Sequence, residues 1–159
     1  MKKLRFVCFM CLMGLLACML SGCDKDDNYV DLGLPSGTKW KSVNEIGGNM
    51  GLYTYDKAVK KFGDKLPSID QWLELLHYCH CEKSKGRVKF IGLNGNTIVL
   101  PVSIKVRDCD GNVDEIRGAY WSSTPCIDSE YAAALVFGAW NGHCQPRCCK
   151  YSVRLIKNQ

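Results

Sequence analysis

Apolar residues recur with the period of an α-helix in two segments of the first half of the chain. In the first segment four of them fall at positions i, i+3, i+4 and i+7, namely Tyr55, Ala58, Val59 and Phe62. Thr54 stands at the position of a helix cap, and Gly63 stands where a helix commonly ends. The pattern therefore predicts a short amphipathic helix between these two residues.

The second helical segment follows Pro67. Ser68 and Gln71 have the spacing of a capping box, in which each side chain accepts a hydrogen bond from the other residue's backbone N–H. The apolar face of this segment consists of Trp72, Leu75, Leu76 and Cys79. We expect a helix from about Ile69 to His80.

From Arg87 onward the apolar period changes to two, as in strands with one buried face. A turn at residues 94–96 separates two such segments and predicts a hairpin. Other extended segments are expected at residues 29–40, 102–106, 120–123 and 151–155. Residues 131–137 are ambiguous, because three alanines favour a helix whereas Leu135-Val136-Phe137 favours a strand. Two helices followed by antiparallel strands indicate an α+β domain.

The beginning of the chain has a different pattern, which indicates export. Lys2, Lys3 and Arg5 precede an uncharged, mostly apolar run from Phe6 to Leu20. This is the order of features in a secretory signal peptide. The run is shorter than the roughly 20 residues that a transmembrane helix needs.

The next residues indicate a lipid anchor. Leu20-Ser21-Gly22-Cys23 resembles the bacterial lipobox, which implies that residues 1–22 are cleaved and that Cys23 is acylated. Asp24-Lys25-Asp26-Asp27 resembles the acidic signal of surface-exposed lipoproteins of the Bacteroidetes, which implies display on the outer membrane. An ordinary solvated tether is the alternative, and it leaves the side of the membrane open. We expect a signal peptide (1–22), a lipidated tether (23–28) and one domain (29–159).

The composition of the mature chain excludes one class of partner. Removal of residues 1–22 leaves 137 residues with 18 basic and 16 acidic side chains, a net charge of +2. The length suits one domain with one core. No basic cluster is interleaved with aromatic residues, so we do not expect nucleic-acid binding.

Seven cysteines remain after cleavage and acylation: Cys79, Cys81, Cys109, Cys126, Cys144, Cys148 and Cys149. Outside the cytoplasm such a number predicts disulfides, and an odd count leaves at least one cysteine without an intramolecular bond. The sequence does not define the pairing. Cys148 and Cys149 are adjacent, and because a bond between neighbours strains the peptide, we expect them to reach different partners.

Six segments of the mature chain, in this order, resemble the Fibrobacter succinogenes major paralogous domain family. They are YVDLGLPSGTKW (29–40), GLYTYDKAVKKFG (51–63), LPSIDQWLELL (66–76), GLNGNTIVLP (92–101), YWSST (120–124) and YSVRLIK (151–157). The resemblance implies a C-type-lectin-like fold, with two helices on a twisted antiparallel sheet and neighbouring termini. It implies a loop surface that binds glycans or proteins, although fold alone does not fix activity.

The chain departs from that family at its cysteines. Val43 stands where many members have a cysteine, and the family cysteine near the end of the second helix matches Cys79. The resemblance therefore implies that Cys79 has lost the partner usual in that family or found another one. The cysteine-rich residues 144–149 are also unusual for the family.

Calcium-dependent sugar binding has little support in the sequence. Calcium prefers several converging carboxylates, but Trp140-Asn141-Gly142 lacks the acid found in calcium-binding lectins, and Arg147 stands where an acid would be needed. The loop at residues 108–112 contains two aspartates and could hold calcium. Such clusters are more commonly plain turns.

A zinc or redox site is a further alternative. His77, His80 and Cys81 share a helical face, on which Cys79 does not lie, and a remote ligand would come from His143, Cys144, Cys148 or Cys149. The simpler interpretation is a buried Cys79, two exposed histidines and a disulfide at Cys81. We expect no cofactor.

The remaining interpretation is a non-enzymatic binding surface, because no catalytic motif is present. Trp140 and Trp121 are candidates for stacking on a sugar ring or a peptide side chain. Their polar neighbours are Ser122, Ser123, Asn141 and His143. The predicted ligand is a glycan or a protein. The alternative is a structural surface protein that disulfides make rigid.

Overall fold

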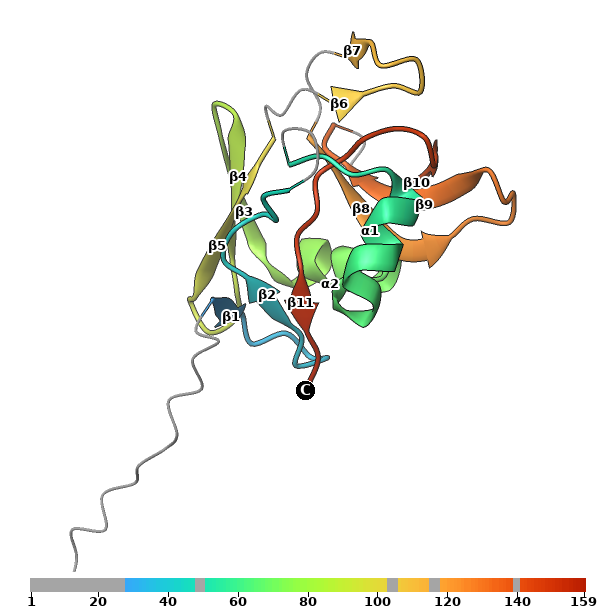
Figure 1. The fold of residues 1–159 in the computed structure, drawn as a ribbon. Helices are drawn as coiled ribbons and strands as arrows, with labels where there is room; N and C mark the ends of the chain where they lie inside the picture. The colour runs from blue at the N-terminus through green and yellow to red at the C-terminus, as the bar shows by residue number, and fades with distance from the viewer. Residues whose placement is uncertain (1–27, 48–50, 103–105, 115–117, 139–140) are drawn as a thin grey trace, which may run out of the picture.

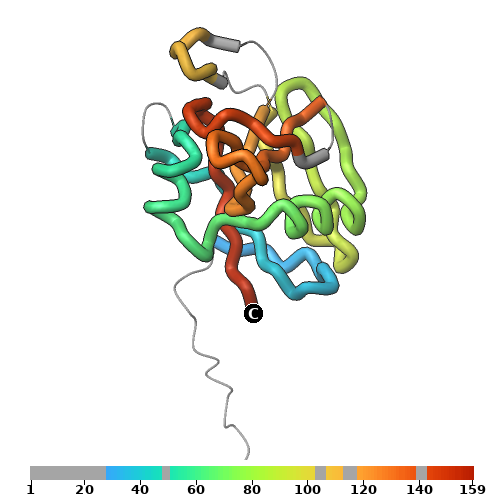
Figure 2. The backbone as a smooth tube through the Cα atoms, turned by 90° about the vertical axis from the view of Figure 1, so that its right-hand side faces the viewer, coloured from blue at the N-terminus to red at the C-terminus, as the bar shows by residue number. Residues whose placement is uncertain are grey.

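The first and last strands of the domain lie in one small antiparallel sheet. The computed structural model describes residues 28–47, 51–102, 106–114, 118–138 and 141–159 (Figure 1). Strand β2 (Lys39–Lys41) lies between β1 (Tyr29–Asp31) and β11 (Ile156–Lys157). A turn closed by the Gly37 N–H, which donates to the Leu34 carbonyl at 2.9 Å, joins β1 to β2. The N-terminal strand and the C-terminus therefore lie at the same end of the domain (Figures 1 and 2).

The two predicted helices are confirmed. Helix α1 (Tyr55–Phe62) ends at Gly63, whose φ of 52° suits glycine, and a 3₁₀ turn, η1 (Gly63–Lys65), follows. Thr54 occupies the cap position of α1 without a side-chain hydrogen bond. Helix α2 (Ile69–Tyr78) begins with the complete Ser68–Gln71 capping box. It ends two residues earlier than expected, because Cys79 is extended and strand β3 starts at His80.

The predicted hairpin is the greater part of a second sheet. Strands β4 (Arg87–Ile91) and β5 (Thr97–Pro101) pair antiparallel, with alternate residues buried as the period of two requires. A third strand, β3 (His80–Ser84), pairs with β4 on its other side. The sequence did not predict β3, because its side chains are mostly polar and exposed.

A third sheet settles the ambiguous segment as a strand. Strand β9 (Tyr131–Val136) is central, between β8 (Ala119–Pro125) and β10 (Asn141–Pro146). Its three alanines are buried, and hydrogen bonding to strands on both sides overrides their preference for helix. Strand β10 was not predicted, because its sequence, NGHCQP, carries no apolar alternation.

A fourth pair of strands stands away from the body of the domain. Strands β6 (Val106–Arg107) and β7 (Val113–Asp114) form a hairpin at the end opposite β1 and the C-terminus (Figures 1 and 2). A backbone pair ties it to the C-terminal segment, where the Lys150 N–H donates to the Arg107 carbonyl at 2.9 Å.

The architecture corrects the expectation of two helices on one sheet. The protein is α+β, but the two short helices of the described residues contact two different clusters of buried residues, and the described strands form three small antiparallel sheets and a hairpin. Trp72 of α2 belongs to one cluster, and Tyr55 of α1 belongs to the other. Strand β8 separates them, because its neighbours Tyr120 and Trp121 point to opposite faces.

The predicted closing strand is only partly formed. Residues 151–156 are all buried, so the apolar alternation does not mark an exposed face. The segment makes single bridges, with Tyr151 antiparallel to Tyr53 and Ser152 parallel to Tyr120. Regular strand structure is limited to β11. No helix among the described residues is long and apolar enough to cross a membrane.

Candidate functional site

The structure separates the residues that were predicted to form a binding surface. Trp121 and Ser122 are fully buried: the Trp121 indole N–H donates to the Tyr53 carbonyl at 2.7 Å, and the Ser122 hydroxyl donates to the Ala133 carbonyl at 2.8 Å. Both therefore belong to the interior and offer no surface to a ligand. Ser123 is half-buried, and its carbonyl accepts the Tyr55 hydroxyl at 2.9 Å.

The other members of that predicted set lie on or before β10. His143 is half-buried there, and Asn141 begins the strand, while Trp140 lies outside the described residues. Strand β9 lies between β10 and the β8 residues Trp121, Ser122 and Ser123. The described members of the predicted set therefore do not form one exposed surface, because Trp121 and Ser122 are buried.

A groove beside α1 is a better candidate for a ligand site. Its volume is about 540 Å³, and we call it the lysine groove. It is lined by Leu52, Tyr53, Thr54, Lys57, Lys60, Lys61 and Lys150. The helical period places three of these lysines on one side of α1, since they stand at i, i+3 and i+4. The fourth comes from the C-terminal segment, which the pairing of Tyr151 with Tyr53 holds against this region.

The charge of the groove is not neutralised by the protein. Within the described residues, none of the four lysines has a carboxylate within salt-bridge distance. Asp56, the acidic residue of α1, faces Arg147 instead, at 3.5 Å. The Lys61 ammonium is oriented by the Tyr53 hydroxyl, 3.3 Å away, and lies 5.3 Å from the centre of the Tyr53 ring. The result is a concave cationic surface with an apolar floor.

The sequence carried part of the signal for this groove. The polar face of α1 can be recognised from its period, and it contains Lys57, Lys60 and Lys61. Lys150 could not be assigned to it, because only tertiary structure brings the C-terminal segment next to α1.

Four of the seven cysteines between residues 79 and 149 form disulfides in the described structure. Cys109 bonds Cys148, and Cys126 bonds Cys144. The prediction of a disulfide framework is therefore confirmed in part, and the adjacent Cys148 and Cys149 do not bond each other. Cys79 and Cys81 carry thiols, so the expected disulfide at Cys81 is not present.

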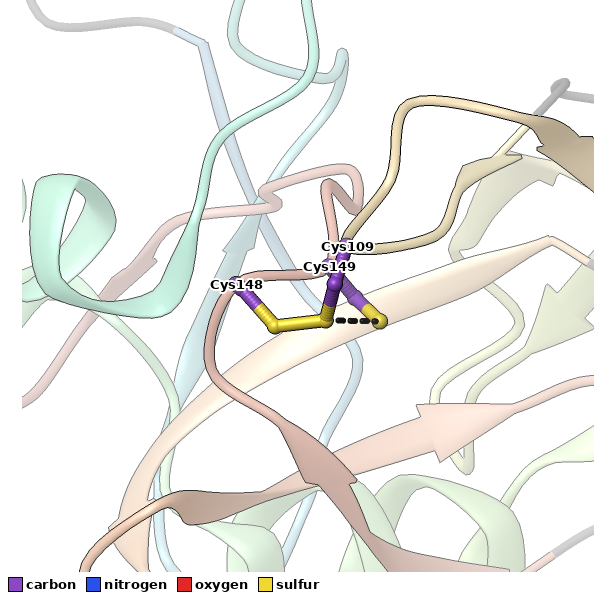
Figure 3. Close-up of side chains that lie close together, drawn as sticks. All are labelled: Cys109, Cys148 and Cys149. Carbon is purple, nitrogen blue, oxygen red and sulfur yellow. Dashed lines mark hydrogen bonds between the residues drawn. A yellow bond between two sulfur atoms is a disulfide. The ribbon is translucent and has the colours of Figure 1, made fainter.

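A third sulfur lies beside the Cys109–Cys148 bond. The sulfur of Cys149 is 3.9 Å from that of Cys109, and Figure 3 shows the three side chains at the meeting of two turns. Their sulfur atoms lie within 4.8 Å of one another. Among the described residues this is the only group of three cysteine, histidine or acidic side chains so close together.

The alternative zinc set does not converge. His77 is on α2 and exposed, whereas His80 and Cys81 are on β3, and the described structure does not gather them with Cys144, Cys148 or Cys149. Burial, with the nearby Cys81 and Glu74 adding to it, raises the pKa of the Cys79 thiol to about 11. Burial also raises the pKa of the Cys81 thiol. Both shifts favour the protonated thiol, whereas the thiolate is the form that binds a metal.

The loop at residues 108–112 forms a turn that the Asp108 side chain closes. The Asp108 carboxylate accepts hydrogen bonds from the side chain and the backbone N–H of Asn112, at 3.0 and 2.8 Å. The side-chain bond is the main reason why the pKa of Asp108 is lowered. Gly111 completes the turn with a φ of 87°. Arg147, which stands where calcium-binding lectins need an acid, forms an ion pair with Asp56 and lies 4.7 Å from the centre of the Tyr55 ring. Its positive charge would repel calcium.

Comparison with known proteins adds no assignment. No family model matches the sequence, and neither a curated protein nor a solved structure matches the chain.

Proposed function

We propose that the protein is an outer-membrane lipoprotein, displayed at the cell surface, whose C-type-lectin-like domain binds an acidic saccharide in the lysine groove without catalysing a reaction. The observation that carries the proposal is the groove itself, which gathers four lysines without a neutralising carboxylate in the described structure. The features of residues 1–27 support export and anchoring through Cys23.

The size of the groove favours a small ligand over a protein. Ligand sites are typically about 300–1,000 Å³, and the groove, at about 540 Å³, falls in this range. A stable protein interface needs about 800 Å² on each partner. Lysine ammonium groups are flexible point charges, which suit carboxylate or sulfate groups that are dispersed along a saccharide. The lining offers ammonium groups for the acidic groups of a saccharide, and hydroxyl and apolar groups for its sugar rings.

The arrangement of the chain ends supports the lectin-like interpretation. Strands β1 and β11 flank β2, so the domain begins and ends in one sheet, which agrees with the neighbouring termini that the resemblance implies. The distribution of the helices over two clusters is its main departure from the expected form. Five residues, Asp24 to Asn28, join Cys23 to β1, and at about 3.3–3.6 Å each they keep the domain within about 20 Å of the membrane.

Binding can be tested with the full lipoprotein in detergent micelles. The probes are defined uronate and sulfated oligosaccharides and a neutral oligosaccharide of the same length, titrated by calorimetry at low and high salt. We expect binding of the acidic probes alone, weaker at high salt because exposed charges are screened. In the double variant Lys57→Gln/Lys60→Gln we expect affinity to fall about fivefold or more, since each exposed ion pair contributes up to about 1 kcal/mol.

A matched control distinguishes the groove from net charge. Lys85 and Lys157 are also exposed, and they lie outside the groove. The variant Lys85→Gln/Lys157→Gln removes the same charge and should change the affinity less than twofold. Equal losses in the two double variants, or equal binding of the neutral saccharide, would refute the proposal.

Anchoring has a separate test. Fatty-acid labelling of the wild type and of Cys23→Ser in cells, followed by mass spectrometry of the N-terminus, should find an acylated Cys23 and no label in the variant. Protease added to whole cells should then remove the domain. An intact Met1 or an unmodified Cys23 would contradict the anchored state.

A second function is favoured by the two disulfides. Both involve the segment from residue 144 to residue 148, which they tie to Cys109 and Cys126. A structural surface protein stiffened in this way needs no ligand. It would resist unfolding in its oxidised form and fail to bind any probe in the experiment above.

A further inference from the structure

The cluster of Cys109, Cys148 and Cys149 combines a disulfide with a neighbouring thiol. Cys109 lies in the turn between β6 and β7, whereas Cys148 and Cys149 lie in the turn after β10. Cys109 and Cys148 are exposed, but Cys149 is buried, with 7% of its surface accessible. The Cys149 sulfur contacts that of Cys109 at 3.9 Å (Figure 3).

The backbone holds these two turns together independently of the sulfur bond. The Lys150 N–H donates to the Arg107 carbonyl at 2.9 Å, and the Arg107 N–H donates to the Lys150 carbonyl at 3.5 Å. Consequently Cys109 stays close to both Cys148 and Cys149, whichever of the two it bonds. The three sulfurs already lie within 4.8 Å of one another, and the Cys149 sulfur is 3.9 Å from that of Cys109, so exchange needs no large movement of the backbone.

We propose that these three residues form a thiol–disulfide exchange site, in which the cysteine thiol passes from the buried Cys149 to the exposed Cys148. The Cys149 thiol loses its proton to solvent, and the thiolate attacks the Cys109 sulfur. The Cys109–Cys149 bond forms as the Cys109–Cys148 bond breaks, and the Cys148 thiolate leaves with the electron pair and takes up a proton. One disulfide and one thiol are present before and after, so no oxidant or reductant is needed.

The geometry selects Cys109 as the sulfur that is attacked. Attack on Cys148 would join two adjacent residues in a bond that strains their peptide. Attack on Cys109 produces a bond that closes nearly the same loop as before. The Cys126–Cys144 disulfide cannot exchange in this way, because no third cysteine of the described residues forms a close group with its two sulfurs.

The consequence is an exposed thiol that exists only after exchange. The β6–β7 hairpin, whose turn contains Cys109, lies at the end of the domain opposite the N-terminal strand (Figures 1 and 2). There the Cys148 thiolate can attack an external disulfide, forming a mixed disulfide and releasing one thiol from the reagent. This is a covalent attachment site for disulfide-bearing molecules, and it does not depend on the lysine groove.

The exchange can be followed by labelling the full lipoprotein in detergent. N-ethylmaleimide is added at pH 8.5 under native conditions, and the protein is then denatured, reduced and treated with iodoacetamide. Chymotrypsin cleavage after Trp140 and Tyr151 yields a peptide containing both Cys148 and Cys149, in which tandem mass spectrometry locates the first label. We expect most of the maleimide on Cys148, because exchange continually supplies its exposed thiol.

Two variants make the result specific. Cys149→Ser should lose the maleimide label on Cys148, because no thiol remains to release it. Cys148→Ser should form a Cys109–Cys149 disulfide when the protein is treated with oxidised glutathione. This result would show directly that the Cys149 sulfur can reach the Cys109 sulfur. Maleimide on Cys149 alone, or on neither residue after a day, would overturn the proposal, as would Cys109 and Cys149 remaining thiols in Cys148→Ser.

Discussion

Two regions of the molecule are held together by different means. The aromatic centre, which we define as Trp40, Trp72 and Tyr120, is completely buried, and its ring centroids lie 4.6 Å (Trp40 to Trp72) and 5.6 Å (Trp72 to Tyr120) apart. The cystine end, which comprises residues 106–114 and 141–150, contains Cys109, Cys144 and Cys148, all of them exposed. Apolar burial stabilises the first region, whereas covalent bonds stabilise the second.

The difference predicts how each region responds to its surroundings. The aromatic centre contains no disulfide and is insensitive to oxidation state. The cystine end contains bonds that reductants break and thiols exchange. The lysine groove adjoins the cystine end through Lys150, whereas its helix, α1, packs through Tyr55 on the buried Trp121 ring, 5.5 Å away.

The largest effect is expected in the aromatic centre. Trp72→Ala should lower the free energy of unfolding by about 3–5 kcal/mol, because it removes a fully buried indole and leaves a cavity. It also removes the indole N–H bond to the Trp121 carbonyl, 3.3 Å long. Urea titration followed by near-UV circular dichroism measures the change. The adjacent Leu73, 41% exposed, provides the control, and Leu73→Ala should cost less than about 0.5 kcal/mol. Similar losses in both variants would contradict this account of the core.

A smaller effect is expected at the cystine end. Cys126→Ser/Cys144→Ser removes a bond across 18 residues of chain, which should cost about 2–3 kcal/mol. The β8–β9–β10 hydrogen bonds persist, so the sheet should survive. Urea titration with and without dithiothreitol tests both points, since reductant should lower the stability of the wild type. A variant that also carries Cys109→Ser/Cys148→Ser should no longer respond to reductant. If it still responds, the two disulfides do not account for the redox dependence.

The elements that sequence predicts well are those with local causes. Helix α2 starts where the Ser68–Gln71 box places it, and α1 ends at Gly63, because caps act within one turn. The β4–β5 hairpin follows from its turn residues and alternation. Strands β3 and β10 could not be predicted from the sequence, because they are strands through their pairing with β4 and β9 and not through an apolar pattern of their own.

The candidate sites are harder to predict because they join distant segments. The burial of Trp121 follows from its place in a strand between two clusters, so its removal from the binding surface has a plain physical cause. The three lysines of α1 are visible in the helical period, but Lys150 is not. Similarly, the pairing of Cys109 with Cys148 rather than Cys149 depends on how the β6–β7 hairpin meets the C-terminal turn. No spacing rule encodes that contact.

The smallest effect concerns the thiol at the margin of the aromatic centre. Because burial raises the pKa of Cys79 to about 11 from an ordinary value of 9.0, the folded protein keeps this proton while the unfolded chain releases it. The unfolded state binds fewer protons between pH 9 and pH 11, so stability is complete below pH 9 and falls as the pH rises through this window. We expect Cys79 to account for a loss of about 1–2 kcal/mol.

Urea titrations of Cys149→Ser and of Cys149→Ser/Cys79→Ala at pH 8 and pH 10.5 isolate the contribution of Cys79, because the shared substitution prevents exchange at the cystine end. The difference in stability between the two proteins should shrink at the higher pH. A constant difference would mean that Cys79 ionises equally in the folded and unfolded states, and that the margin of the aromatic centre is as open to water as the cystine end.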